Sequence, residues 1–270
     1  MCRSLSVSRS GFYRWCKGVK SPRAEANKKL LDTIRKIHED SRGIYGSPKV
    51  TDALRDMGLV CNHKRVARLM RAHGIRSKIK RRFKVTTHSR HTRPMVPNLV
   101  RRDFSAQAPD RLWTSDITYI RTGEGWLYLA VFLDTFSRLI VGWAMSHRIN
   151  DRLVLAAFQQ AWKQRRPPAG LVVHSDRGSQ YCSHRFRSLL ETNGYRQSMG
   201  ITGNCYENAI TESFFASLKS EWVYHERYTT RAEASRSIFK YIEIFYNRQR
   251  IHAALGGVCP EQFEILQAAA

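Results

Sequence analysis

The hydrophobic pattern changes at about Phe104, and this change limits the folds that the chain can adopt. From there the residues form runs rich in β-branched and aromatic side chains, which is typical of strands. These runs are separated by short turns, and they are Leu112–Ile120, Trp126–Leu133 and Leu139–Ala144. Three consecutive strands joined by short turns predict an antiparallel meander.

After the meander, helix and strand patterns alternate. Helices are predicted at 151–163, at 183–192 and from Ala209, and short strands at 171–174 and 195–198. Asn208 is a suitable N-cap for the last of these helices, whose apolar stripe repeats every four residues. This order predicts an α/β fold of the ribonuclease-H-like type, a mixed sheet flanked by helices, over residues 104–225.

The first hundred residues carry most of the positive charge. The chain has a net charge of +24, and residues 1–100 contain 25 Lys and Arg against 6 Asp and Glu. A charge excess of this kind is typical of a polyanion binder, so DNA is the expected partner. A solvated basic surface and an anionic membrane are the alternatives.

This basic region is predicted to be all-α. Residues 1–21 hold one short helix capped by Ser8, which resembles the second half of a helix-turn-helix motif, so the chain is expected to be a shortened copy. Residues 22–76 are predicted to form a helix-turn-helix domain: a helix over 22–40, one capped by Ser47 with Met57 on its apolar face, and one capped by Asn62. The third helix carries the expected DNA contacts, which are Lys64, Arg65, Arg68 and Arg71.

A basic linker is predicted over residues 77–103. It lacks hydrophobic periodicity, and it contains Lys80, Arg81 and Arg82. We expect these three side chains to contact DNA phosphates, and a linker that touches no DNA is the alternative.

Three acidic residues stand out by their positions in the predicted strands and helices. Asp116 lies inside an otherwise apolar strand, where an acid is costly to bury unless it is paired or binds a metal. Asp176 follows directly on a buried strand, and ligand sites in α/β sheets gather at strand carboxyl ends. Glu212 is the only acid between Ala209 and Ser220. The alternative for Asp116 is a structural hydrogen-bonding role, and the alternative for Asp176 is a role in a turn. For Glu212 it is a position on an ordinary surface helix.

Together the three acids suggest a metal site. Carboxylate oxygens are the ligands that Mg²⁺ prefers, and it keeps open positions for water and phosphate. Two such ions can activate the attacking oxygen and neutralise the leaving one during in-line displacement.

These motifs resemble a known family. Asp116 in TSDITYI, Asp176 in HSDRGSQY, and Glu212 in GNCYENAITESFFASLK, with 35 residues between the last two acids, are similar to the DDE triad of retroviral-integrase-like transposases. GEGWLYLAVFLDTFSRLIVGWAMS and YNRQRIHAALGGVCPEQFE also resemble the second-frame product of IS-three family insertion sequences. The resemblance covers nearly the whole chain.

The resemblance implies a function and its parts. It implies an integrase catalytic core that cleaves at the element's ends and joins the freed 3′-hydroxyl to target DNA. The cofactor would be two Mg²⁺ ions, with Mn²⁺ able to substitute, held by Asp116, Asp176 and Glu212, and Lys219 would contact the element's end. The partners would be terminal inverted repeats, target DNA, further copies of the chain and an upstream-frame product. The protein would act in the bacterial cytoplasm, bound to nucleoid DNA.

The remaining features narrow the function. The six cysteines show no metal or disulfide spacing, which fits a reducing cytosol, and no signal peptide or membrane span is predicted. Glu124 and Asp134 are interpreted as turn residues. Residues 226–270 are expected to be a helical tail packed on the core, with a helix over 230–246, and DNA contact by Arg248 and Arg250 is the alternative to packing.

Two other functions compete with transposition. One is a DNA-binding regulator, or an inhibitory truncated transposase, without catalysis. The other is a ribonuclease-H-like nuclease that does not join strands. The presence of all three acids favours the transposase over the regulator.

Overall fold

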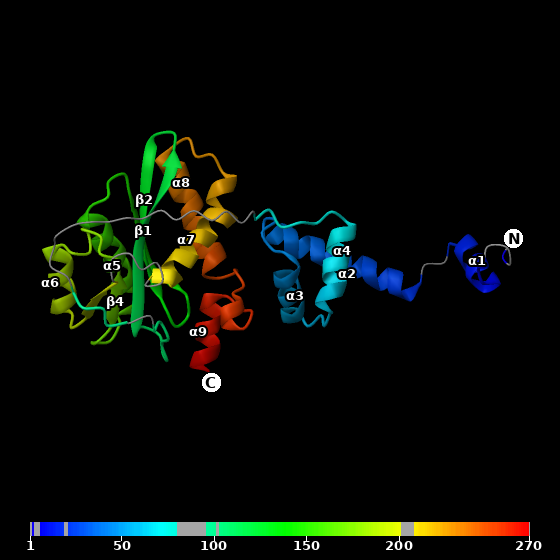
Figure 1. Ribbon diagram of the computed structural model, residues 1–270, viewed down its shortest axis with the longest axis horizontal. Helices are drawn as coiled ribbons and strands as arrows, with labels where there is room; N and C mark the ends of the chain where they lie inside the picture. Colours follow the sequence, from blue (N-terminus) through cyan, green and yellow to red (C-terminus); the bar gives the residue numbers. More distant parts are fainter. Residues whose placement is uncertain are drawn as a thin grey trace. The chain divides into compact units, whose positions relative to one another are not determined.

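The structure is a computed structural model that describes residues 2, 6–18, 21–79, 96–100, 103–200 and 208–269. Two compact units make up the chain, an N-terminal unit, Met1–Lys78, and a C-terminal unit, Ile79–Ala270. Figure 1 shows helices alone in the first and a sheet with helices in the second. No helix in the described ranges is long and apolar enough to cross a membrane.

The N-terminal unit contains α1 (Arg9–Cys16), α2 (Pro22–Asp40), α3 (Ser47–Asp56) and α4 (His63–Ala72). The last three pack on one another through a small apolar core, because each places one apolar stripe inward. The buried members of this core include Leu31, Ile34, Val50, Leu54, Val66 and Met70.

The helix ends follow local chemistry. The predicted caps Ser8 and Asn62 are confirmed, since their side chains accept from the backbone N–H groups of Gly11 and Lys64. The predicted cap Ser47 is wrong by one residue: Gly46 is the N-cap, and the hydroxyl of Ser47 instead pairs with His63 Nε2 at 3.0 Å.

Met57 was also expected on the apolar face of α3, and this is wrong. The helix ends at Asp56, and the side chain of Met57 is 57% exposed. Gly58 then takes a positive φ of 76°, a conformation that glycine adopts without strain, and it turns the chain toward α4.

The C-terminal unit is built on a five-stranded sheet. Its strands are β1 (Leu112–Thr122), β2 (Gly125–Asp134), β3 (Ile140–Ser146), β4 (Val172–Ser175) and β5 (Arg196–Met199), in the order β3-β2-β1-β4-β5. The first three form the predicted antiparallel meander, and β4 and β5 add in parallel to β1.

Helices cover both faces of this sheet. The helices α5 (Asp151–Arg165) and α6 (His184–Thr192) lie on one face, and α7 (Ala209–Glu221) and α8 (Arg231–Phe239) on the other, as Figure 1 shows. Successive residues of β1 point to opposite faces, so Thr114 bonds to Thr211 of α7 while Ser115 bonds to Tyr181 before α6. The predicted α/β class, a mixed sheet flanked by helices, is confirmed.

The larger core lies between the sheet and α5. It includes Trp113, Phe132, Phe158, Phe186 and Met199, all at most 1% exposed. Gly142 of β3 lets α5 come close, because a Cβ there would lie 2.5 Å from the Cβ of Ala161.

The tail differs in one respect from its prediction. The single helix expected over 230–246 is α8 followed by a π-helical segment, Lys240–Tyr246, and the chain ends in α9 (Pro260–Ala268). The apolar face expected for it is confirmed, because Ala234, Ile238, Tyr241, Ile242 and Phe245 are all buried.

Candidate active site

The strand register brings two of the acids together. Ser115 of β1 and Ser175 of β4 are aligned partners in the parallel pairing. Asp116 and Asp176 are the residues that follow them, so the two aspartates lie next to each other where β4 ends. This is the carboxyl edge of the sheet, where the sequence placed a ligand site.

Backbone groups orient both carboxylates. The amide of Ile117 donates to Asp116 Oδ1 at 2.7 Å, and the amide of Gly178 donates to Asp176 Oδ1 at 2.9 Å. Burial raises the pKa of Asp116 well above its ordinary value, and the charges of Asp176 and Glu212 raise it further. The site therefore concentrates negative charge in a partly dry environment.

The helix α7 supplies the third acid. At its start Asn208 Nδ2 donates to the Ser115 carbonyl at 3.2 Å, and Thr211 Oγ1 donates to Thr114 Oγ1 at 2.8 Å. These bonds fix the first turn of α7 against β1, beside the two aspartates. Glu212 is exposed on that turn, and partial desolvation raises its pKa.

The carboxylates are near one another without being gathered as ligands. Glu212 is close enough to act on the pKa of Asp116. Within the described ranges, no three His, Cys, Asp or Glu side chains meet closely enough to hold one metal ion.

Lys219 lies on the same side of α7, two turns after Glu212. Its ammonium group is 4.9 Å from the centre of the Tyr119 ring, a cation–π contact. Burial lowers the pKa of Lys219 and the charge of Asp116 raises it, so the lysine faces the acidic site.

Comparison with known proteins identifies the family. The "Insertion element IS600 uncharacterized 31 kDa protein" of Shigella sonnei is 43% identical, over 97% of this chain and 97% of its own length. The "Transposase InsF for insertion sequence IS3A" of Escherichia coli strain K12 is 42% identical, over 98% of this chain and 92% of its own length. The chain belongs to the IS3 family of insertion-sequence transposases. The resemblance in the sequence is thereby confirmed.

Three family models match separate parts of this transposase. An "Integrase core domain" matches residues 106–205, a second "Integrase core domain" model matches 212–267, and an "HTH-like domain" matches 25–83. Among solved structures, the HTLV-2 integrase catalytic core domain in complex with magnesium is 16% identical, covering 59% of this chain and 99% of that one, with a TM-score of 0.47. As an IS3-family transposase with an integrase core, the protein is a DDE polynucleotidyl transferase that acts on DNA.

The N-terminal unit of the transposase displays most of its expected DNA contacts. Lys64, Arg68 and Arg71 are exposed on α4. Arg65 is half-buried, because its Nε donates to Asn27 Oδ1 of α2 at 2.9 Å. Lys80, Arg81 and Arg82 lie outside the described residues.

The structure adds to two interpretations of single residues. Asp134 begins the turn between β2 and β3, as interpreted, because it accepts the backbone N–H of Phe136, but it is also fully buried and accepts the backbone N–H of Asp110. Of the two alternatives for Arg250, the structure agrees with packing, because its side chain is 11% exposed and ion-paired to Glu221. The side chain of Arg248 is 59% exposed, and its Nε lies 3.5 Å from Glu261 Oε2.

Sequence reasoning missed the hydrogen bond of Tyr181 and the ion pair between Glu221 and Arg250. Tyr181 hydrogen-bonds Ser115, the neighbour of Asp116, at 2.7 Å, and burial raises the pKa of this tyrosine well above its ordinary value. Its place in the motif HSDRGSQY, five residues after Asp176, was the available signal. Glu221 and Arg250 gave no local signal, because they are 29 residues apart.

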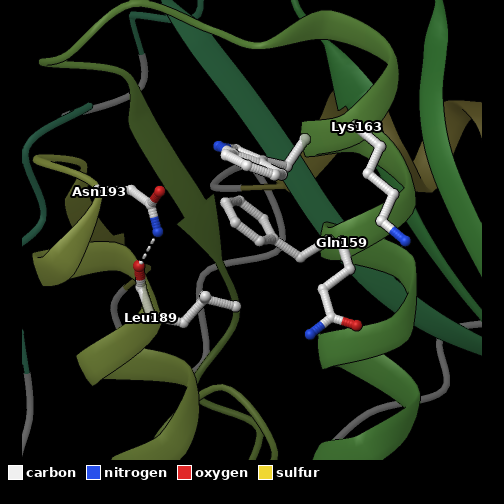
Figure 2. Close-up of a pocket in the computed structure, with 6 residues that line it drawn as sticks. Gln159, Lys163, Leu189 and Asn193 are labelled. Atoms are coloured by element: carbon white, nitrogen blue, oxygen red, sulfur yellow. Dashed lines mark hydrogen bonds between the residues drawn. The ribbon is translucent and has the colours of Figure 1, made fainter.

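A pocket of about 270 Å³ lies elsewhere, between α5 and α6. Figure 2 shows Gln159 and Lys163 on one helix and Leu189 and Asn193 on the other side, with Asn193 Nδ2 donating to the Leu189 carbonyl at 2.7 Å. None of the three acids lines it, so it is separate from the acidic site.

Proposed function

We propose that this transposase binds the ends of its element, cleaves DNA there with the help of Mg²⁺, and joins the freed 3′-hydroxyl to target DNA. The observation that carries the proposal is the register of β1 and β4, which leaves Asp116 and Asp176 side by side at a strand end. The charge that Glu212 exerts on Asp116 supports a shared role for all three acids.

The donor set fits a divalent cation. Three carboxylates supply hard oxygen ligands, which suit Mg²⁺, with Mn²⁺ as a substitute. Burial and like charges disfavour the ionised form of Asp116, and a bound cation would relieve that penalty. Asp116, Asp176 and Glu212 would hold two ions. Bound there, the ions would activate the attacking oxygen and neutralise the leaving one.

Other residues of the chain would place the DNA. We propose that Lys219 contacts a phosphate at the element's end, because its ammonium group faces the acids and rests on Tyr119. Exposed Lys64, Arg68 and Arg71, with Arg65 beside them, would bind backbone phosphates, as would Lys80, Arg81 and Arg82. Replacing Arg68 with Ala should weaken binding of all duplexes and lower the salt slope by about 0.9.

The domain boundaries are part of the same proposal. They are a partial helix-turn-helix at 1–21, a DNA-binding domain at 22–76, a basic linker at 77–103, a catalytic core at 104–225 and a tail at 226–270. Joining two element ends at one target calls for more than one active site, so we propose that several copies act together on DNA. An upstream-frame product is a further proposed partner, and the proposed place of action is the bacterial cytoplasm.

Substitution of each acid tests the proposal. Asp116→Ala, Asp176→Ala and Glu212→Ala should abolish Mg²⁺-dependent joining of a labelled element end while leaving DNA binding largely intact. Glu191→Ala, which removes an exposed acid of α6, is the control and should keep full activity. Unchanged joining in the three variants would remove the assignment. In the wild type, nicking without joining would favour a nuclease, and binding without either would favour a regulator.

A further inference from the structure

Two opposite sides of the helix α7 make different contacts. At about 100° per residue, Glu212 and Lys219 lie within about 20° of each other around the helix axis, whereas Glu221 lies about 180° from Glu212. The side bearing Glu212 and Lys219 faces the site, and the side bearing Ser217, Leu218 and Glu221 is turned toward the tail.

The tail, residues 226–270, contacts that second side of α7 through the side chain of Arg250. Arg250 forms a bidentate pair with Glu221, with Nη2–Oε1 at 2.7 Å and Nε–Oε2 at 2.8 Å. Its Nη2 also donates to Ser217 Oγ, one turn earlier on α7, at 3.1 Å. The hydroxyl of Tyr241 donates to Glu221 Oε2 at 3.0 Å. With Glu221 3% exposed and Arg250 11% exposed, these bonds are shielded from water.

The arginine is itself held in place. Its guanidinium lies 5.7 Å from the centre of the Tyr246 ring, and its Nη1 is 3.2 Å from His252 Nε2. Tyr246 in turn packs edge-on against Phe214 of α7, with ring centres 4.7 Å apart. The tail therefore contacts three successive turns of α7, at Phe214, Ser217 and Glu221.

We propose that Arg250 is a positioning residue for catalysis: it fixes the rotation of α7 and so sets where Glu212 and Lys219 point. This inference rests on the proposed function. A rotation of about 20° would move a side chain on the far side of the helix by on the order of 2 Å, given a helix radius of about 5–6 Å with side chains. Catalytic groups need to be held within about 0.5 Å, so α7 requires an anchor on the side away from the site.

A purely structural ion pair is the competing explanation, and metal binding separates the two. A structural role lowers the folded fraction, whereas a positioning role weakens metal binding in protein that remains folded. The variants are Arg250→Met and Arg250→Lys, which keeps the charge but loses the bidentate geometry. Arg236→Met is the control, since Arg236 is an exposed arginine of the same tail.

The experiment measures Mn²⁺ affinity by titration calorimetry, at a temperature where circular dichroism shows each full-length variant folded. Joining of a labelled element end is assayed in parallel. We expect Arg250→Met to weaken Mn²⁺ binding at least fivefold and joining at least fiftyfold, Arg250→Lys to be intermediate, and Arg236→Met to match the wild type. If Arg250→Met does not fold, Arg250→Lys decides.

Two failures can be told apart. A folded Arg250 variant with wild-type Mn²⁺ affinity and joining would overturn this inference alone, with the proposed function intact. A wild-type protein that neither binds Mn²⁺ nor joins ends would overturn the proposed function, and this inference with it.

Discussion

Two clusters of three carboxylates in the C-terminal unit differ in how their charge is balanced. In the first, the guanidinium of Arg165 of α5 pairs with three carboxylates. Its Nε lies 3.0 Å from Asp110 Oδ1, its Nη2 lies 4.0 Å from Asp134 Oδ2, and its Nη1 lies 2.7 Å from Oε2 of Glu264 in α9. One guanidinium thus ties α5, the start of the sheet, the end of β2 and the last helix together. We refer to it as the arginine-centred cluster.

The second cluster is the acidic site of Asp116, Asp176 and Glu212. Among the described cations, Lys219 is the one that lowers the pKa of Asp116, and the two other acids raise it. The contrast teaches that similar acids serve opposite purposes according to their counter-charge. In the arginine-centred cluster one guanidinium pairs with all three carboxylates and stabilises the fold, whereas in the acidic site burial and like charges raise the pKa of Asp116, which under the proposed function favours a cation from outside.

Removing one acid from the acidic site should have the largest effect on activity. Asp116→Asn should lower end joining by on the order of 10³-fold or more, because it removes one of the proposed metal ligands. The same change should leave the metal-free protein equally stable or about 1 kcal/mol more stable, because it removes a crowded charge. Joining assays and urea unfolding in EDTA measure the two effects. A destabilised Asp116→Asn protein would erase the contrast between the clusters.

Breaking the arginine-centred cluster should have the largest effect on stability. Arg165→Met leaves three carboxylates near one another without their cation, and should cost about 3–5 kcal/mol. Urea unfolding checks this, with Arg236→Met, at an exposed position, expected within about 0.5 kcal/mol of the wild type. A loss for Arg165→Met no larger than that of its control would mean that the cluster does not stabilise the fold.

Adding metal should distinguish the clusters directly. At about 100 times its dissociation constant, Mg²⁺ should stabilise the wild type by about 2.7 kcal/mol, seen as a melting temperature higher by several degrees. Asp116→Asn should lose this shift, whereas Asp110→Asn, in the arginine-centred cluster, should keep it. A shift that disappears with Asp110→Asn and survives Asp116→Asn would reverse the assignment.

The smallest expected effect is a pH dependence from Asp134. The pKa of Asp134 is raised to about 6, and burial is the largest cause. Two backbone N–H groups and the charge of Arg165 lower this pKa but do not offset the effect of burial. The folded pKa lies above the ordinary value of 3.8, so its contribution to stability is complete below about pH 4 and is lost as the pH rises toward 6. Unfolding of Asp134→Asn between pH 4 and 7 should lack this component. An identical slope in both proteins would contradict the assignment.

Local patterns were sufficient to predict most of the fold. The bounds of α2 agree with the prediction of a helix from Pro22 to about residue 40, because Pro22 opens it and its apolar stripe continues to Ile37 in the last turn. The strands follow from runs of β-branched and aromatic residues that only a sheet accommodates well. The register that brings Asp116 beside Asp176 was not predictable, because it depends on how β1 and β4 align over 60 residues of sequence.

The buried charges were the least predictable features. Asp134 was interpreted as a turn residue, and nothing in the local pattern indicated that it would be fully buried with Arg165 of α5 nearby. For Arg250, which lies in a basic stretch, DNA contact stayed open as the alternative to packing, because its partner Glu221 ends a distant helix. In both cases the environment is created by tertiary packing, which a local pattern does not contain.

Locating a bound metal tests the central claim most directly. Crystals of the full chain soaked with Mn²⁺ should give an anomalous scattering peak within about 2.5 Å of carboxylate oxygens of both Asp116 and Asp176. No peak should appear at the arginine-centred cluster. Saturating Mn²⁺ that leaves the two aspartates without a peak, or that binds elsewhere in the C-terminal unit, would contradict the proposal that these acids carry the chemistry.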